Sequence, residues 1–104
     1  MDTIALVYQV QLTEEFKDWL DALRDRRAQI RVVARLRSAE AGNLDDWKSV
    51  GGGVSELRVN FGAGYRLYFA RRGCIVIVML VGGDKSSQKT DIERAQRIAR
   101  ELET

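Results

Sequence analysis

Histidine is absent from the 104-residue sequence. It is the commonest metal ligand and the usual general acid or base near neutral pH, so its absence excludes histidine-containing zinc sites and Ser-His-Asp triads. We therefore expect neither a metal nor a cofactor. The usual general acid or base at neutral pH is therefore missing, and any acid–base catalysis must use another side chain.

Proline is also absent, and cysteine occurs once. A single thiol cannot form an internal disulfide, and Cys74 opens an apolar run, so we expect it to be a buried hydrophobic side chain. That run, Cys74 to Val81, is far shorter than the ~20 apolar residues of a membrane-spanning helix. No signal-peptide pattern opens the chain. We expect a cytoplasmic protein with no membrane partner.

Composition and charge indicate one folded domain with a basic segment. Hydrophobic residues make up 45% of the chain and charged residues 31%. These values are typical of a globular protein and predict a single domain over residues 1–104. The net charge is only +2, but residues 48–89 contain seven basic residues and two acidic ones. We expect this segment to contact a polyanionic partner.

The first forty residues predict a strand and then a helical hairpin. The strand covers Ile4 to Val10, Thr13 caps a first helix, and Asp25 caps a second helix that runs to about Glu40. Apolar residues recur with helical spacing on the first helix, at Phe16, Trp19, Leu20 and Leu23. Basic residues recur on the second helix, at Arg27, Arg31 and Arg35. This stripe is either a solvated face or a contact with RNA or an acidic partner.

Short strands follow the break at Gly42-Asn43. Residues 56–61 and 65–69 alternate between apolar and polar side chains, which predicts two half-buried strands. A three-residue loop over 62–64 would pair Phe61 with Tyr65 and would place all the large apolar side chains of this hairpin on one face, so Tyr65 is predicted to be core. The opposite face then carries Arg58, Asn60, Arg66 and Tyr68.

The remaining residues predict an interior strand and a last helix. Cys74 to Val81 is apolar on both sides, which is typical of a strand with two neighbours. A helix then begins near Ser86 or Ser87. Its predicted buried residues are Ile92, Ala95, Ile98, Ala99 and Leu102. The predicted fold class is α+β, in the order strand, two helices, β-meander and C-terminal helix.

Several segments together resemble one known family. The most specific are Glu56-Leu57-Arg58, Gly64-Tyr65-Arg66 followed by Tyr68-Phe69, and Gly82-Gly83-Asp84-Lys85-Ser86-Ser87-Gln88. With these segments the sequence is similar, over nearly its whole length, to the addiction-module killer proteins. These proteins form the phage-derived Gp49-like, or HigB-type, branch of the RelE/ParE toxin superfamily.

The resemblance implies a compact α+β domain with helices packed on a curved antiparallel sheet. It also implies the toxin of a type II toxin–antitoxin system, neutralised by a cognate antitoxin that we expect to be a helix-turn-helix protein of the HigA type. The implied activity is that of a ribosome-dependent mRNA endonuclease, an mRNA interferase that inhibits translation, with mRNA and the ribosome as partners. Relatives of the ParE kind instead poison DNA gyrase, so the alternative is a non-enzymatic inhibitor of gyrase or another protein. A decayed toxin that only binds its antitoxin is a third possibility.

Metal-free RNA cleavage needs a base for the attacking 2′-hydroxyl, an acid for the leaving 5′-oxygen and cations for the charge on phosphorus. Guanidinium groups suit the last role, a lysine from the flanking loops suits proton transfer, and a tyrosine can stack on a base or donate a hydrogen bond. The predicted catalytic residues are therefore Arg58, Arg66, Lys85 and Tyr68. Many HigB-like relatives place a histidine near the end of this site, and the sequence departs from them there.

Further residues of the same segments are predicted to bind RNA. They are Lys48, Asn60, Arg71, Arg72, Asp84, Ser86 and Gln88, and Lys48 is the alternative to Lys85 for proton transfer. The glycine-rich segment before the last helix lacks the Walker A spacing, so an NTPase is rejected. Its helix N-terminus could still bind an RNA phosphate. Asp84 could hold Lys85 or Arg66 in place, or could simply cap the helix.

Overall fold

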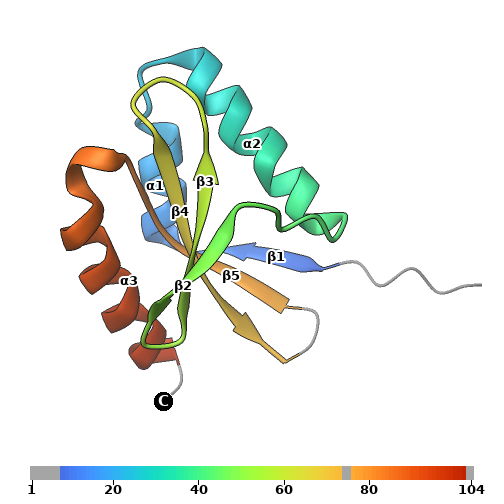
Figure 1. Ribbon diagram of the computed structural model, residues 1–104, viewed down its shortest axis with the longest axis vertical. Helices are drawn as coiled ribbons and strands as arrows, with labels where there is room; N and C mark the ends of the chain where they lie inside the picture. Colours follow the sequence, from blue (N-terminus) through green and yellow to red (C-terminus); the bar gives the residue numbers. More distant parts are fainter. Residues whose placement is uncertain (1–7, 74–75, 103–104) are drawn as a thin grey trace, which may run out of the picture.

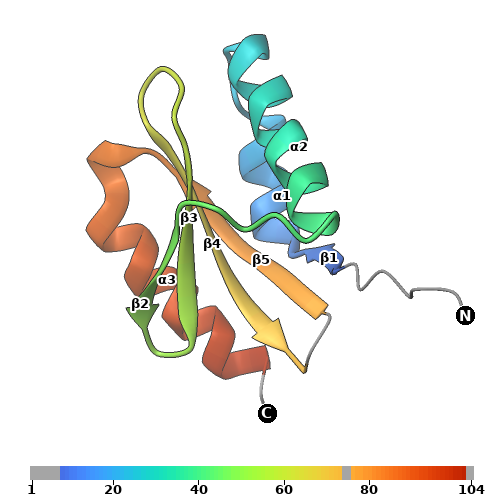
Figure 2. The ribbon, with the colours of Figure 1, turned by 45° about the vertical axis from the view of Figure 1, so that its right-hand side comes forward.

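A computed structural model describes residues 8–73 and 76–102. A five-stranded sheet lies between two N-terminal helices on one face and the C-terminal helix on the other (Figures 1 and 2). The elements in chain order are β1 (Gln9–Leu12), α1 (Glu14–Asp21), α2 (Arg26–Glu40), β2 (Trp47–Gly51), β3 (Val54–Val59), β4 (Tyr65–Arg72), β5 (Val76–Gly83), a short 3-10 helix η1 (Lys85–Ser87) and α3 (Gln88–Leu102). The predicted α+β class is confirmed. None of the helices described here is long and apolar enough to cross a membrane.

Both predicted helix caps are present. The Thr13 hydroxyl accepts a hydrogen bond from the amide of Phe16 at 3.0 Å and donates one to the carbonyl of Leu80 at 2.7 Å. The Asp25 carboxylate accepts from the amide of Arg27 at 2.9 Å. Each cap satisfies a backbone donor that the first turn of a helix leaves free. Thr13 also ties the start of α1 to β5.

The sheet has the strand order β1-β5-β4-β3-β2 and is mixed. β1 pairs with β5 in parallel, whereas the other neighbours are antiparallel. The predicted all-antiparallel sheet is therefore wrong at this edge, because alternation of apolar and polar residues identifies a strand without giving its direction. Residues 4–7 of the predicted first strand and the predicted core residue Cys74 lie outside the described residues. β5 has two neighbours, as predicted.

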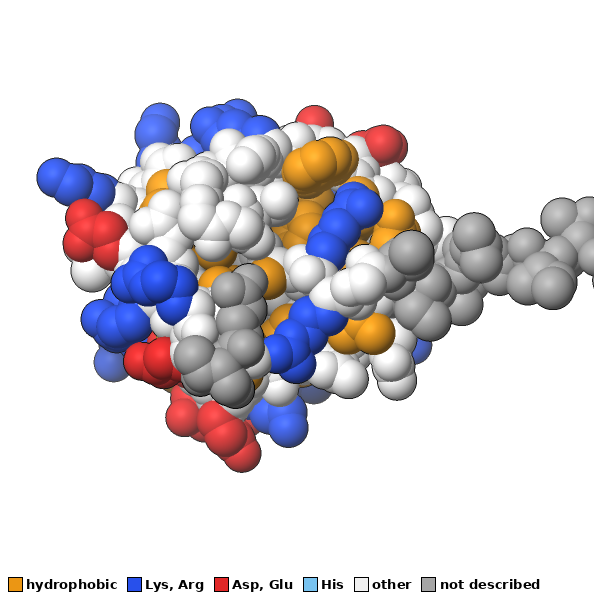
Figure 3. Space-filling model, turned by 90° about the horizontal axis from the view of Figure 1, so that it is seen from below, with side chains coloured by type: hydrophobic (Ala, Val, Ile, Leu, Met, Phe, Trp, Pro, Cys, Tyr) orange, Lys and Arg blue, Asp and Glu red, His pale blue; other side chains and the backbone are white. Residues whose placement is uncertain are grey.

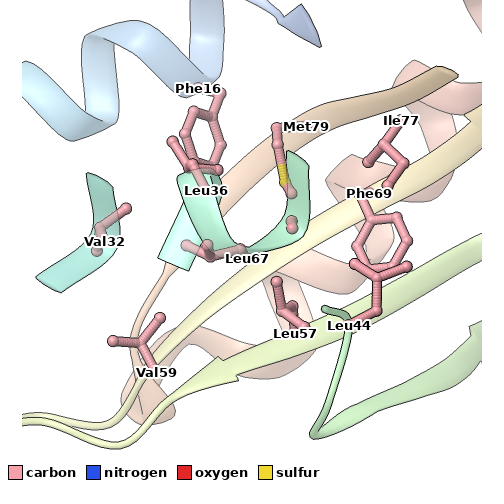
Figure 4. Packing of buried hydrophobic residues seen from close by; sticks show 11 residues of the cluster. Phe16, Val32, Leu36, Leu44, Leu57, Val59, Leu67, Phe69, Ile77 and Met79 are labelled. Carbon is pink, nitrogen blue, oxygen red and sulfur yellow. The ribbon is translucent and has the colours of Figure 1, made fainter. Parts of the chain in front are cut away.

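Two hydrophobic cores form because both faces of the sheet are covered. The core against α1 and α2 (Figure 4) consists of Phe16, Val32, Leu36, Ala39, Leu44, Leu57, Val59, Leu67, Phe69, Ile77 and Met79. The core against α3 consists of Val54, Tyr68, Val78, Leu80, Val81, Ala95 and Ala99. Leu102 is 38% exposed, so its predicted burial is wrong. It is the last residue of α3, where the helix ends and solvent reaches the side chain.

The β3–β4 hairpin has a longer loop than predicted. Val59 pairs with Tyr65 and Arg58 with Arg66, so the loop spans residues 60–64 and not 62–64. Asn60 consequently lies in the loop and not in the strand. Because the pairing has moved by an even number of positions, every residue that stays in a strand keeps its predicted face.

Phe61 explains the longer loop. Its ring lies beneath two guanidinium groups of α2, with the Cζ atoms of Arg27 and Arg31 at 5.8 and 5.0 Å from the ring centroid. Such cation–π contacts are attractive, and they hold the ring against the helix and away from the strand ladder. The basic stripe of α2 therefore faces the hairpin tip at these positions.

Two glycines let the sheet approach both helical layers closely. A Cβ atom at Gly82 would collide with the Trp19 ring of α1, and one at Gly83 would collide with the Asp91 carboxylate of α3. Close packing therefore accounts for the Gly82-Gly83 pair without a phosphate ligand.

Replacing Leu67 by alanine should lower the free energy of unfolding by ~2 to 5 kcal/mol, because the side chain is fully buried in the core against α1 and α2. Urea denaturation measures this loss. Ile30→Ala is the matched control, since Ile30 is 59% exposed and its truncation should change stability by no more than ~0.5 kcal/mol. Equal losses in the two variants would contradict the assignment of Leu67 to the core.

Candidate functional site

A buried carboxylate is the centre of a polar cluster on the α3 face of the sheet. Glu56, in β3, has a fully buried side chain. Its Oε1 atom lies 3.5 Å from Nε of Arg58, 3.7 Å from Nε of Arg66 and 4.0 Å from Nζ of Lys48. Its Oε2 atom accepts a hydrogen bond from Nε2 of Gln88 at 2.9 Å. We call these five residues the Glu56 cluster.

Strand pairing brings the Glu56 cluster together. Glu56 lies opposite Lys48 of β2 and Tyr68 of β4, and Arg58 lies opposite Arg66. Two arginines directly opposite each other repel. A carboxylate two residues before Arg58 points to the same face and offsets that repulsion. Sequence reasoning did not select Glu56, although it is the acidic residue on an otherwise basic strand face.

The cluster carries more positive than negative charge. Two arginines and one lysine surround a single carboxylate, which leaves a formal charge of +2. The side chains of Lys48 and Arg58 are 54% and 45% exposed, whereas that of Arg66 is 11% exposed. Lys48 and Arg58 therefore reach the surface, whereas Arg66 and the shared counter-ion Glu56 are buried beneath them. This arrangement can bind a phosphate group, and guanidinium groups suit its oxygens.

Tyr68 does not belong to an open arginine face, and this part of the prediction is wrong. The residue has the predicted strand parity, but α3 covers that half of the face and leaves the side chain fully buried. Burial raises the pKa of the Tyr68 hydroxyl far above its ordinary value, and the neighbouring Glu56 carboxylate adds to the rise. Stacking of Tyr68 on a base would require α3 to move.

The loops beside the cluster are joined through backbone groups. Arg66 donates from Nη1 to the carbonyl of Gly64 at 2.9 Å. The amide of Lys85 donates to the carbonyl of Ala63 at 3.4 Å. The β3–β4 loop therefore lies next to η1, and the exposed Lys85 lies close to Gly64 of this loop, as does the Arg66 guanidinium.

Asp84 caps the segment that leads into α3. Its Oδ1 atom accepts from the amide and from the hydroxyl of Ser86, at 2.8 and 2.5 Å. The Ser86 hydrogen bond holds the pKa of Asp84 below its ordinary value, and Arg66 adds to that effect. The Asp84 carboxylate therefore occupies the amide of Ser86, so the predicted capping role is observed. Binding of a phosphate at the start of α3 stays a prediction.

The remaining predicted RNA-binding residues lie in separate places. Arg72 donates to the carbonyl of Leu102 at the end of α3. Arg71 lies between the rings of Tyr8 and Trp47. Asn60 lines a groove between α2 and the edge of β3. The structure therefore brings Lys48, Arg58, Arg66 and Gln88 together, with Lys85 in a neighbouring loop, and leaves the arginines at the end of β4 apart.

No group of three or more histidine, cysteine, aspartate or glutamate side chains that could hold a metal ion occurs within residues 8–73 and 76–102. Glu56 itself is surrounded by cations, which is the opposite of a metal site. The chemistry available to the cluster is therefore that of positive charge and proton donors.

Comparison with known protein families identifies the family of the chain. The family model "Phage derived protein Gp49-like (DUF891)" matches residues 18–103. The chain belongs to the Gp49-like family. The protein is also 39% identical over 97 residues to an uncharacterized protein of Haemophilus influenzae, with 93% of this chain and 98% of that protein covered. The Gp49-like family is associated with the toxins of toxin–antitoxin systems.

Replacing Tyr68 by phenylalanine should leave the stability of this Gp49-like protein unchanged or slightly raised. The buried hydroxyl has no hydrogen-bond partner among the described residues, and removing an unsatisfied buried polar group relieves its desolvation cost. Thermal unfolding is the measurement, and a clear loss of stability in the Tyr68→Phe protein would show that the hydroxyl makes a stabilising contact.

Replacing Glu56 by glutamine keeps the shape of the side chain but removes the charge that holds the three cations. Breaking a fully buried ion pair costs about 3 to 5 kcal/mol, and we expect less here because Lys48 and Arg58 are half-exposed and can be resolvated. Added salt should restore part of the loss, because it screens the repulsion among the cations that remain. A Glu56→Gln protein as stable as wild type at low salt would contradict the role of the carboxylate.

Proposed function

We propose that this Gp49-like protein is the toxin of a type II toxin–antitoxin system and that it stops translation by cleaving mRNA on the ribosome. The observation that carries the proposal is the Glu56 cluster, in which one buried carboxylate lies 3.5 to 4.0 Å from three cations, two of them about half-exposed. Cations held in this way suit a reaction in which negative charge develops on a phosphate.

The reaction would be attack of the RNA 2′-hydroxyl on the adjacent phosphorus, with departure of the 5′-oxygen. Arg66 is nearly buried, and its guanidinium is held by the Gly64 carbonyl and by Glu56. It would stabilise the charge on the phosphorane, with Arg58 reaching the phosphate from the more exposed side. Lys48 or Lys85 would transfer the protons, because no histidine is available.

The proposed partner is a cognate helix-turn-helix antitoxin of the HigA type. An antitoxin could cover the cations of the Glu56 cluster directly. It could also displace α3, which would break the hydrogen bond from Gln88 to Glu56 and expose the core around Tyr68. Either route would prevent the cluster from binding RNA. Acidic antitoxin residues would speed association by electrostatic attraction.

A second candidate is a non-enzymatic inhibitor of DNA gyrase or another protein. Two observations favour it: the absence of histidine, and the burial of Tyr68, which removes the predicted base-stacking side chain from the arginine surface. The arginines would then be interface residues.

The test is induction of wild type and variants, with growth arrest and primer extension on ribosome-bound mRNA as readouts. Arg58→Ala should lower the cleavage rate by about 100- to 1000-fold, the scale for one lost oxyanion donor, and Arg66→Ala by at least as much. Arg97→Ala removes an exposed arginine of α3 and should cleave like wild type.

The alternative has its own readout. Growth arrest without any mRNA cleavage, together with loss of gyrase supercoiling activity, would overturn the endonuclease and support the second candidate. Arg66→Ala can also lose activity by misfolding because Arg66 is nearly buried, so the half-exposed Arg58 provides the cleaner comparison.

A further inference from the structure

An aromatic and cationic stack lies on the surface away from the Glu56 cluster. The Cζ atom of Arg71 is 5.4 Å from the ring centroid of Tyr8 and 5.3 Å from that of Trp47. Trp47 is 46% exposed, although indole rings are usually well buried. Figure 3, viewed from below, shows basic side chains lying directly against apolar ones at the surface. This combination of exposed ring and guanidinium suits a flat, negatively charged ligand.

The stack lies in one of two adjoining hollows. The first has a volume of about 480 Å³ and its lining includes Tyr8, Trp47, Arg71 and Asp46. The second, between α2 and the edge of β3, has a volume of about 370 Å³ and its lining includes Arg31, Arg35, Arg58 and Asp46. Asp46 belongs to both linings, so the two hollows adjoin there, and we call them together the trough. The lining of the second hollow also contains Arg58 of the Glu56 cluster.

We infer that this trough holds single-stranded RNA on one side of the proposed cleavage site, with a base stacked on Trp47 beside Arg71. The inference rests on the proposed function. Besides Arg58, which is paired with Glu56, the trough lining contains Arg31, Arg35 and Arg71 against two aspartates, Asp45 and Asp46, which leaves a formal charge of +1. A single strand fits better than a duplex, because unpaired bases are free to stack on an exposed ring.

The geometry of β2 connects the trough to the cluster. Trp47 and Lys48 are neighbours in β2, and successive side chains of a strand point to opposite faces. Trp47 pairs with Leu57, which faces α2, while Lys48 pairs with Glu56, which faces α3. An RNA strand in the trough would therefore need to cross only the edge of the sheet, at Arg58 and Lys48, to bring its phosphate to the Glu56 cluster.

The test uses the purified protein and a short single-stranded RNA with 2′-O-methyl groups, which cannot be cleaved through its 2′-hydroxyls. Binding should quench tryptophan fluorescence in wild type but not in Trp47→Phe, which retains only Trp19. Trp47→Ala should weaken binding by about 5- to 100-fold, the range for loss of one stacked base. Arg71→Ala should weaken binding and lower the salt dependence by about 0.7 in log–log slope, if it meets one phosphate.

Ile30→Ala and Arg97→Ala are the controls, because they remove an exposed apolar and an exposed basic side chain outside the linings of the trough. They should bind the RNA like wild type. Normal RNA binding by Trp47→Ala and Arg71→Ala, or no binding by wild type, would overturn the inference. So would loss of antitoxin binding in these variants with RNA binding intact, because the trough would then be an antitoxin surface.

The result also separates this inference from the proposed function. Normal cleavage by a Trp47→Ala protein that binds RNA normally would contradict the trough as an RNA site and would leave the proposed endonuclease activity supported. A protein that binds RNA through Trp47 but never cleaves mRNA on ribosomes would support the trough as an RNA site. It would contradict the proposed endonuclease activity.

Discussion

The contact between the buried Glu56 carboxylate and three cations is the constraint on which the polar half of the molecule depends. Arg58 and Arg66 are paired across neighbouring strands, and without a counter-ion their repulsion would oppose the pairing of β3 with β4. The carboxylate offsets that repulsion and in return is stabilised by the cations and by Gln88 of α3. Because Gln88 is the first residue of α3, the same contact also links the helix to the sheet.

The two faces of the sheet differ in polarity and in what they support. The face against α1 and α2 provides most of the large buried apolar side chains. The face against α3 is apolar toward the end of the helix and polar toward its start, where the Glu56 cluster reaches the surface. Gly82 and Gly83 allow both helical layers to approach β5 closely. The apolar parts provide rigidity, and a site for phosphate chemistry needs such rigid support to keep its cations in place.

Local rules predicted much of this arrangement. Side-chain capping found the starts of α1 and α2 at Thr13 and Asp25, and strand alternation put Arg58 and Arg66 on one face of the hairpin. Long-range contacts decided the rest. Phe61 left the ladder to meet α2, α3 covered Tyr68, and β1 paired in parallel with β5. Glu56 was missed for a similar reason, because the role of an acidic residue on a polar strand face can be recognised only when its cross-strand neighbours are known.

The most direct test of this arrangement is a double-mutant cycle between Glu56 and Arg66, with the free energy of unfolding as the measured quantity. The cycle compares Glu56→Gln, Arg66→Met and the double variant with wild type. If the carboxylate holds the guanidinium, the sum of the stability losses of the two single variants should exceed the loss of the double variant by about 1 to 3 kcal/mol. Losses that add to within about 0.5 kcal/mol would show that the two side chains are independent, and would contradict a site organised by Glu56.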